Sequence, residues 1–333
     1  MTAPAQLATT PSQLAGIPEP LEQKLRLVAA RLLQAAGILL ELYDTPFPPS
    51  WTASSPIQSV TDEFHSPQPT IATAVVLLQR FYLVTAISAS PLLPTCLAAL
   101  FLACKLTERP QKPRDLVNVF KYLLSPASPL HPPHLRPPAD ASKPSNKDLY
   151  YVSEGDYTAL RSLLLQTEAQ ILRAIGFDTT VHLPYTLAFN YLQSLNVLTH
   201  KTPTAPPPSD EALFNPLQND KLVATTFAYL TDMLSSPSQP YLTHHPHELA
   251  VAGIYMAARD HSVKLPDRWW EVWDVERETL GFLLVVGRGG TYIGSGGKVW
   301  VVEEGSFEEQ QGGEVVAISK DSVAREALRL LAE

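Results

Sequence analysis

The sequence predicts an all-α protein in which two small helical bundles follow one another along the chain. Apolar residues recur at three- and four-residue steps in one block after another, which is the spacing of amphipathic helices. Two alanine-rich blocks, 91–106 and 247–261, are apolar on nearly every side, as the buried central helix of a bundle is. The 31 prolines, against only 15 glycines, gather between the apolar blocks and indicate extended connections between rigid helices.

The first bundle is expected over residues 21–178. The preceding segment, 1–20, is rich in Ala, Thr, Pro and Gln and is predicted to be disordered, as is a proline-rich insertion at about 125–150. Gly176 is a typical left-handed terminator for the last helix of this bundle. Its five helices are predicted at 21–42, 70–83, 91–106, 113–124 and from Glu154 or Asp156 to Ile175.

The second half, residues 179–286, repeats this plan more loosely around a proline-rich linker at about 202–216. Its helices are predicted from His182 or Pro184 to Leu195, at 219–234, at 247–261, and from Asp267 or Trp269 to Val286. Residues 287–333 differ in character. They hold a cluster of glycines, a strand-like KVWVVEE, an acidic Gln-rich patch and a short helical SVAREALRLLAE, and they are expected to form an irregular Gly-rich tail.

Charge and cysteine usage exclude several classes of protein. Charged residues make up 17% of the chain and the net charge is −8, so the broad basic surface of a nucleic-acid-binding protein is missing. Cys96 and Cys104 lie on roughly the same face of one predicted helix and cannot bridge along it, which fits a reducing compartment. No run of about 18 apolar residues and no signal-peptide pattern is present, so a soluble intracellular protein without a direct nucleic-acid or membrane partner is expected.

Four segments, in order along residues 21–286, resemble the cyclin family. LAALFLACKLTERPQKPRDLVNVFKYLL is similar to the third and fourth helices of a cyclin box, in the variant of the transcription-type cyclins. Upstream, LLQAAGILLEL resembles the first box helix of the L-type cyclins. Downstream, QTEAQILRAIGFD and VHLPYTLAFNYLQSL resemble the fifth helix and the bridge into a second box. The resemblance is nearest to cyclin L, with cyclins K, T and Q close behind, and it implies tandem five-helix cyclin boxes.

This resemblance also implies a function. A cyclin is a non-catalytic regulatory subunit that binds and activates a cyclin-dependent serine/threonine protein kinase. The transcription-type branch implies a nuclear protein acting in RNA polymerase II transcription or pre-mRNA processing, with no cofactor, metal or small-molecule substrate. Activation requires a rigid helical platform that holds the mobile regulatory helix of the kinase inward, so that the lysine–glutamate pair of the kinase forms around ATP.

By the resemblance, Lys105 and Glu168 occupy positions whose side chains sit at the kinase-facing surface. Glu168 lies nine residues before Phe177, as in the family pattern. A Lys and a Glu on facing helices can bond backbone carbonyls and amides of a partner and fix its helix in register. The alternative for Lys105 is a surface lysine whose stem covers the end of an apolar helix.

Glu108, Arg114 and Asp115 are further candidates for kinase contact. Asp115 lies in the first turn of a predicted helix, where a carboxylate favours the helix dipole, and Arg114 is able to pair with a neighbour. Internal support and partner contact therefore remain open for these residues. Thr107 departs from the acidic residue common in the family. The matching stretch of the first helix, QAAGILLEL, has neither the basic residue nor the tryptophan with which cell-cycle cyclins dock substrate peptides, so no such groove is expected.

Other motifs favour structural roles. Pro246 interrupts the cluster of His244, His245, His247 and Glu248, so a solvated loop is favoured over a metal site. The tryptophans at 269, 270 and 273 have helical spacing and indicate burial, with an exposed partner anchor as the alternative. The glycines of VVGRGGTYIGSGG lack the Gly-Lys-Ser/Thr of a phosphate loop, and no catalytic triad or carboxylate pair is recognisable.

Two rival functions use the same fold. A general transcription factor of the IIB family has two cyclin-like domains, but it needs a basic inter-repeat face and usually a zinc ribbon, and neither is visible here. A scaffold that kept the cyclin fold and lost the kinase is the second rival, which Thr107 and the long insertions favour.

Overall fold

The computed structural model describes residues 9–40, 42, 69–125, 152–195, 216–236, 238–287, 292–293, 299–303, 306–311 and 314–319. The described helices fall into two compact units. One contains residues from Thr2–Tyr43, Pro67–Val181 and Thr291–Glu333, and the other consists mainly of His182–Gly290. Each unit is described by itself below. Among the described residues, no helix is both long and apolar enough to cross a lipid bilayer.

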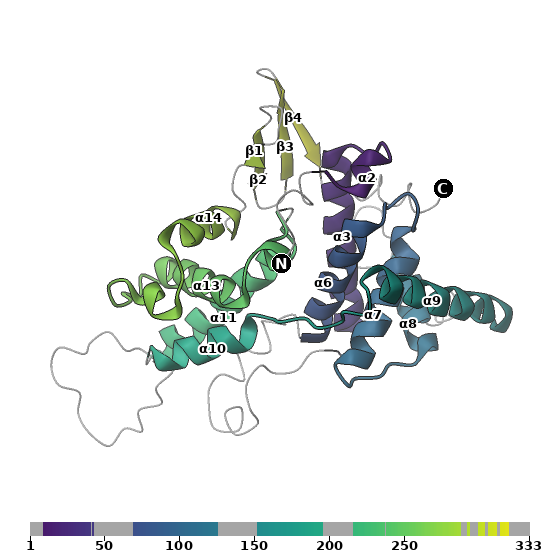
Figure 1. Ribbon diagram of the computed structural model, residues 1–333, viewed down its shortest axis with the longest axis horizontal. Coiled ribbons are helices and arrows are strands. Elements are labelled where there is room, and N and C mark those ends of the chain that lie inside the picture. The colour runs from purple at the N-terminus through teal and green to yellow at the C-terminus, as the bar shows by residue number, and fades with distance from the viewer. Residues whose placement is uncertain are drawn as a thin grey trace, which may run out of the picture. The chain divides into compact units, whose positions relative to one another are not determined.

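The first unit is built around one buried helix, α7, which packs against α3, α6, α8 and α9 (Figure 1). Its residues from Thr95 to Cys104 are all buried, as the all-round apolarity of this block predicts. The helices of the unit are α2 (Pro11–Leu14), α3 (Glu19–Leu39), α6 (Pro69–Val84), α7 (Leu92–Leu106), α8 (Pro113–Leu124) and α9 (Glu154–Ala174). The five helices predicted for this half of the chain are therefore confirmed.

Residues with a left-handed backbone conformation end helices α9 and α7. After α9, Gly176 has a φ of 64° and Phe177 donates its backbone N–H to Leu172 O at 2.8 Å, which confirms Gly176 as the terminator. After α7, Glu108 takes the equivalent place with a φ of 57°, and Arg109 N–H donates to Cys104 O at 2.8 Å. A glutamate at this position carries a steric cost that a glycine would not.

We therefore expect Glu108→Gly to raise the free energy of unfolding by about 0.5–1 kcal/mol, because glycine relieves the strained φ of 57°. The matched control is Lys112→Gly, since Lys112 is exposed with a φ of −71° that any residue adopts. That variant is expected to lose stability through the added freedom of its unfolded chain. Urea unfolding of both variants checks this, and equal changes in the two would contradict the assignment of strain.

The second unit has the same plan around α13. This helix is buried from Leu249 to Ile254 and packs against α10, α11 and α14 (Figure 1). Stacked rings of Tyr185 and Phe227, with centroids 5.9 Å apart, join α10 to α11. The elements of this unit are α10 (Tyr185–Ser194), α11 (Pro216–Leu234), α12 (Pro240–Thr243), α13 (Pro246–Asp260), the 3₁₀ helix η3 (Trp269–Trp273) and α14 (Arg277–Gly287).

The single helix predicted from Asp267 or Trp269 to Val286 is wrong. The chain forms η3 and α14 instead, because Asp274, with a φ of 57°, turns left-handed between them. The predicted burial of the tryptophans holds for Trp269, whose ring packs edge-on against Trp270 and Trp273. The other two tryptophans are only half-buried.

The predicted disorder of residues 1–20 is wrong for residues 10–20. Thr10 caps α2 through a reciprocal pair of hydrogen bonds with Gln13, and α3 already begins at Glu19. The composition of this segment could not reveal its order, since the order comes from contacts with distant residues. Residues 1–8 lie outside the described residues, as do nearly all of the predicted insertion at about 125–150 and the linker at about 202–216.

The tail, predicted to be irregular, contains a four-stranded antiparallel sheet in the order β1-β2-β3-β4. Strand β2 covers most of the strand-like KVWVVEE, and its Val302 lies opposite Phe307 of β3. The strands are β1 (Tyr292–Ile293), β2 (Val299–Glu303), β3 (Ser306–Gln311) and β4 (Glu314–Ser319). The predicted final helix lies outside the described residues.

Candidate functional site

Lys105 and Glu168, 63 residues apart in sequence, form an ion pair in the first unit. Lys105 Nζ donates to Glu168 Oε1 at 2.6 Å and to Oε2 at 2.9 Å. Lys105 is at the last turn of α7 and Glu168 is on α9, and these two helices pack side by side. The structure therefore brings together the two residues that the resemblance singled out.

The two partners differ in exposure. The Lys105 side chain is 43% exposed, whereas the Glu168 side chain is only 10% exposed. Lys105 Nζ also lies 4.0 Å from the centroid of the Phe101 ring, so the ammonium is held by an aromatic face as well as by the carboxylate. Removing the charge of Lys105 would leave a nearly buried carboxylate without its cation, which costs more than losing an exposed ion pair.

Exposed apolar side chains lie on the same two helices and at the end of α9. They are Leu106 on α7, Leu160, Leu163 and Leu165 on α9, and Phe177 directly after it. We call this set, together with Lys105 and Glu168, the α7–α9 surface. Exposed apolar side chains on helices that pack together are candidate contacts for a protein partner. Sequence reasoning missed them, although three successive leucines at 163–165 exceed what one face of a helix can bury.

Arg114 does not join the Lys105–Glu168 pair. It forms an ion pair with Glu154 at the start of α9, and its guanidinium lies 4.6 Å from the centroid of the Tyr157 ring. Both contacts tie the start of α8 to the start of α9. Of the two roles left open for Arg114, internal support and partner contact, these contacts within the chain show the first.

Glu108 and Asp115 are exposed, and neither is brought to the ion pair by a direct contact. Asp115 lies in the first turn of α8, as predicted, where its charge favours the helix dipole. Thr107, the departure from the family pattern, has an internal role. Its Oγ1 lies 2.8 Å from Thr70 Oγ1 at the start of α6, and it donates to Ala103 O at 2.9 Å.

The histidine cluster has a structural role in the second unit. The His245 backbone N–H donates to Glu248 Oε2 at 2.6 Å, so Glu248 caps the start of α13. His244 stacks on Phe282 with ring centroids 5.3 Å apart, and burial lowers the pKa of its imidazole. Within the described part of the chain, no group of three His, Cys, Asp or Glu side chains is arranged to hold a metal ion.

The two cysteines are free and buried in α7. Burial raises the pKa of the Cys104 thiol to about 12 and that of Cys96 further still. Only the thiolate is a good nucleophile, so both thiols are expected to be unreactive in the folded protein.

We expect iodoacetamide at mildly alkaline pH to leave both cysteines unmodified in the folded chain and to alkylate both in urea. Intact-mass measurement over time provides the check. Modification of the folded chain at the rate seen in urea would contradict the burial of Cys96 and Cys104.

Comparison with known proteins shows which family the chain resembles. Residues 52–130 match the family described as "Cyclin, N-terminal domain". The chain is 27% identical to Cyclin-L2 of Homo sapiens over 277 residues, which is 83% of this chain and 42% of that protein. It is also 27% identical to Cyclin-L1 of Gallus gallus over 276 residues, 82% of this chain and 40% of that protein. The chain thus spans about two fifths of the length of these relatives.

Two solved structures share the fold. A chain of the yeast RNA Pol II CTD kinase CTDK-1 complex matches with a TM-score of 0.55 at 14% identity, over 86% of this chain and 71% of that one. A chain of the CAK complex from Chaetomium thermophilum bound to ATP-γ-S matches with a TM-score of 0.51 at 16% identity, over 86% and 75%. In the first unit a buried alanine-rich helix is enclosed by four others, in the second unit a buried helix packs against α10, α11 and α14, and the chain shares its fold with these two solved structures. By sequence the chain is similar to the cyclin family, and within it to the L-type cyclins.

Proposed function

We propose that this chain is the regulatory subunit of a cyclin-dependent serine/threonine protein kinase and that it activates the kinase through the α7–α9 surface. The observation that carries the proposal is the Lys105–Glu168 pair, a half-exposed cation above a nearly buried carboxylate, on two helices that also expose leucines. Charges held in this way are fixed in position before a partner arrives. Such preorganisation lowers the entropy cost of binding.

The surface fits the clamping of a partner helix. The exposed leucines and Phe177 offer apolar area, and the half-exposed Lys105 ammonium has three N–H donors, of which two are engaged by Glu168 among the described residues, so it can reach backbone carbonyls at the end of a helix. The rigid packing of α7 against four neighbouring helices holds the apolar side chains and the ammonium in position. A kinase regulatory helix bound here would be held inward, where the lysine–glutamate pair of the kinase forms.

We assign Glu108 and Asp115, both exposed, to the rim of the same interface, and Arg114 to positioning α9 for it. The proposed domains are a first cyclin box over 21–178 and a second over 179–286. Clear catalytic motifs are missing from the sequence, which supports a regulatory subunit. Similarity to cyclins L1 and L2, and to the fold seen in a kinase complex for the RNA polymerase II C-terminal domain, supports a nuclear role in transcription or pre-mRNA processing.

Affinity purification tests this function. We expect the tagged full chain to retain a protein kinase from a nuclear extract, and the recovered complex to phosphorylate a peptide of the RNA polymerase II C-terminal domain. A gel-shift assay at moderate salt distinguishes a kinase-activating cyclin from a transcription factor, since tight and salt-sensitive DNA binding is expected only of the transcription factor. Recovery of no kinase would contradict the proposal and favour a scaffold.

A further inference from the structure

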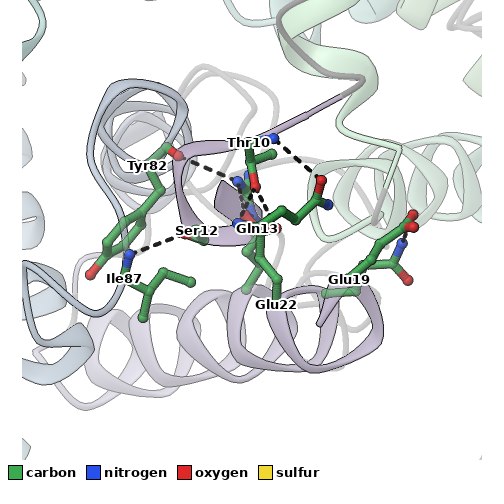
Figure 2. A network of polar contacts seen from close by, with 9 residues as sticks. Thr10, Ser12, Gln13, Glu19, Glu22, Tyr82 and Ile87 are labelled. Carbon is green, nitrogen blue, oxygen red and sulfur yellow. Dashed lines mark hydrogen bonds and ion pairs between the residues drawn. The ribbon is translucent and has the colours of Figure 1, made fainter. Parts of the chain in front are cut away.

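The segment before α3 is held against the first unit by buried polar contacts (Figure 2). Thr10 Oγ1 donates to Glu22 Oε2 at 2.6 Å. The backbone N–H of Ile87, in the turn between α6 and α7, donates to Ser12 Oγ at 3.0 Å. The short helix α2, which follows Thr10 and contains Ser12, also packs on α3 and α6. We call residues 10–17 the docked segment.

The Thr10 hydroxyl is matched to the charge that it meets. Glu22 is 2% exposed, and its other oxygen, Oε1, accepts from Arg26 Nη2 at 2.7 Å and from Arg26 Nε at 3.2 Å. Thr10 is itself 6% exposed, and its proton satisfies the second carboxylate oxygen. The segment therefore stays docked because Thr10 is a neutral donor at a buried carboxylate.

Thr10 is followed directly by Pro11, the acceptor sequence of proline-directed protein kinases. We propose that Thr10 is a phosphorylation site and that its phosphorylation releases the docked segment from the first unit. In the reaction, Thr10 Oγ1 attacks the γ-phosphorus of Mg-ATP, the bond from that phosphorus to the β,γ-bridging oxygen breaks, ADP leaves, and the hydroxyl proton passes to the base of the modifying kinase. Any proline-directed kinase suffices, so the inference is independent of the proposed function.

Phosphorylation of Thr10 destabilises the docked position of the segment for two physical reasons. The hydroxyl proton that Glu22 accepts is lost, and about −1.5 to −2 of charge replaces it beside a carboxylate that is already paired with Arg26. A buried excess of negative charge without a further cation costs several kcal/mol. The phosphoryl group also has no room at a side chain that is almost fully enclosed.

The docked segment is able to open for modification. Its helix α2 has four residues, too short to be stable by itself, and side-chain hydrogen bonds hold it in place. Ser90, also followed by a proline, is different, since its hydroxyl lies 3.0 Å from Thr95 Oγ1 at the start of the central helix α7. Exposing Ser90 would require opening the core of the first unit, whereas exposing Thr10 requires only undocking.

The test uses the full chain, a purified proline-directed kinase and ATP, with phosphosite mapping and hydrogen exchange of the Ile87 amide. We expect phosphate on Thr10 and exchange at Ile87 at least about tenfold faster, because release removes the Ser12 acceptor. Pro11→Ala keeps the Thr10 hydroxyl but removes the recognised proline, so it is expected to stay unmodified at Thr10 and protected at Ile87.

Substituted variants separate charge from the loss of the hydroxyl. Thr10→Glu is expected to speed Ile87 exchange well beyond Thr10→Gln, which has the same size without the charge. Ser125→Glu, at another serine followed by proline, is expected to leave Ile87 unchanged. Two outcomes overturn the proposal: a failure to modify Thr10 while Ser125 is modified, or modified Thr10 with unchanged protection at Ile87. In the second case the phosphate would have been accepted by Arg26 Nη1, which is buried without a hydrogen-bond partner among the described residues.

Discussion

Lys105→Glu and Glu168→Lys are each expected to reduce kinase activation at least about tenfold, the largest functional effect we foresee. Either change sets two like charges against each other at a site where Glu168 is nearly buried and where the paired atoms lie 2.6 Å apart. The polarity that the α7–α9 surface presents to a partner is also altered. Activity of the reconstituted kinase complex and its dissociation constant measure the effect.

The double swap Lys105→Glu/Glu168→Lys separates an internal role from a binding role. It restores an ion pair between α7 and α9, so thermal unfolding is expected to recover most of the stability lost in the single variants. The charges offered to the kinase remain reversed, so activation is expected to remain low. Recovery of both stability and activation would show that the pair is structural only. Arg268→Glu, at an exposed ion pair of the second unit, serves as the control and should leave activation unchanged.

Gly37→Val is expected to have the largest effect on stability, lowering the free energy of unfolding by about 3 kcal/mol. Gly37 lies on the buried face of α3, and a Cβ placed there would be 2.4 Å from both Cδ1 and Cγ1 of Ile71 on α6. Ile71 is itself buried and has no space into which to move. Denaturant unfolding of the full chain measures the loss.

A double-mutant cycle identifies the cause. Ile71→Ala alone is expected to cost about 2–5 kcal/mol through the cavity that it leaves. Combined with Gly37→Val, it should cost clearly less than the sum, because the new valine fills part of that cavity. Gly155→Val provides the control, since a Cβ on Gly155 meets nothing within 4 Å. Strict additivity would mean that the loss in Gly37→Val does not come from contact with Ile71.

Helices with a strong local signal were predictable from the sequence. The α8 helix begins at Pro113 and ends at Leu124 as predicted, because proline favours the first turn and the apolar residues keep helical spacing. The buried centres α7 and α13 were also predictable, since a helix that is apolar on all sides has only one stable location. For the site, the resemblance identified Lys105 and Glu168 but not the exposed leucines of α7 and α9.

The wrong predictions concern segments in which contacts between residues far apart in the sequence outweigh the local sequence pattern. Helical spacing of three tryptophans predicted one helix through Asp274, yet the chain turns left-handed there as Trp269 becomes buried. Residues 10–18 have the composition of a disordered segment, but Glu22 and Ile87 supply the hydrogen bonds that order them. Nothing in the sequence indicated that Arg114 would pair with Glu154, 40 residues further on.

Hydrophobic periodicity and the placement of proline and glycine were enough to define most of the helices and the two-bundle plan, because these properties depend on neighbours within one or two turns. Which charges meet, which leucines remain exposed and whether a polar segment is docked depend on side chains far apart in the chain. Folding decides those features, since the free energy of an ion pair or a buried hydroxyl depends on the surroundings that the packed helices create.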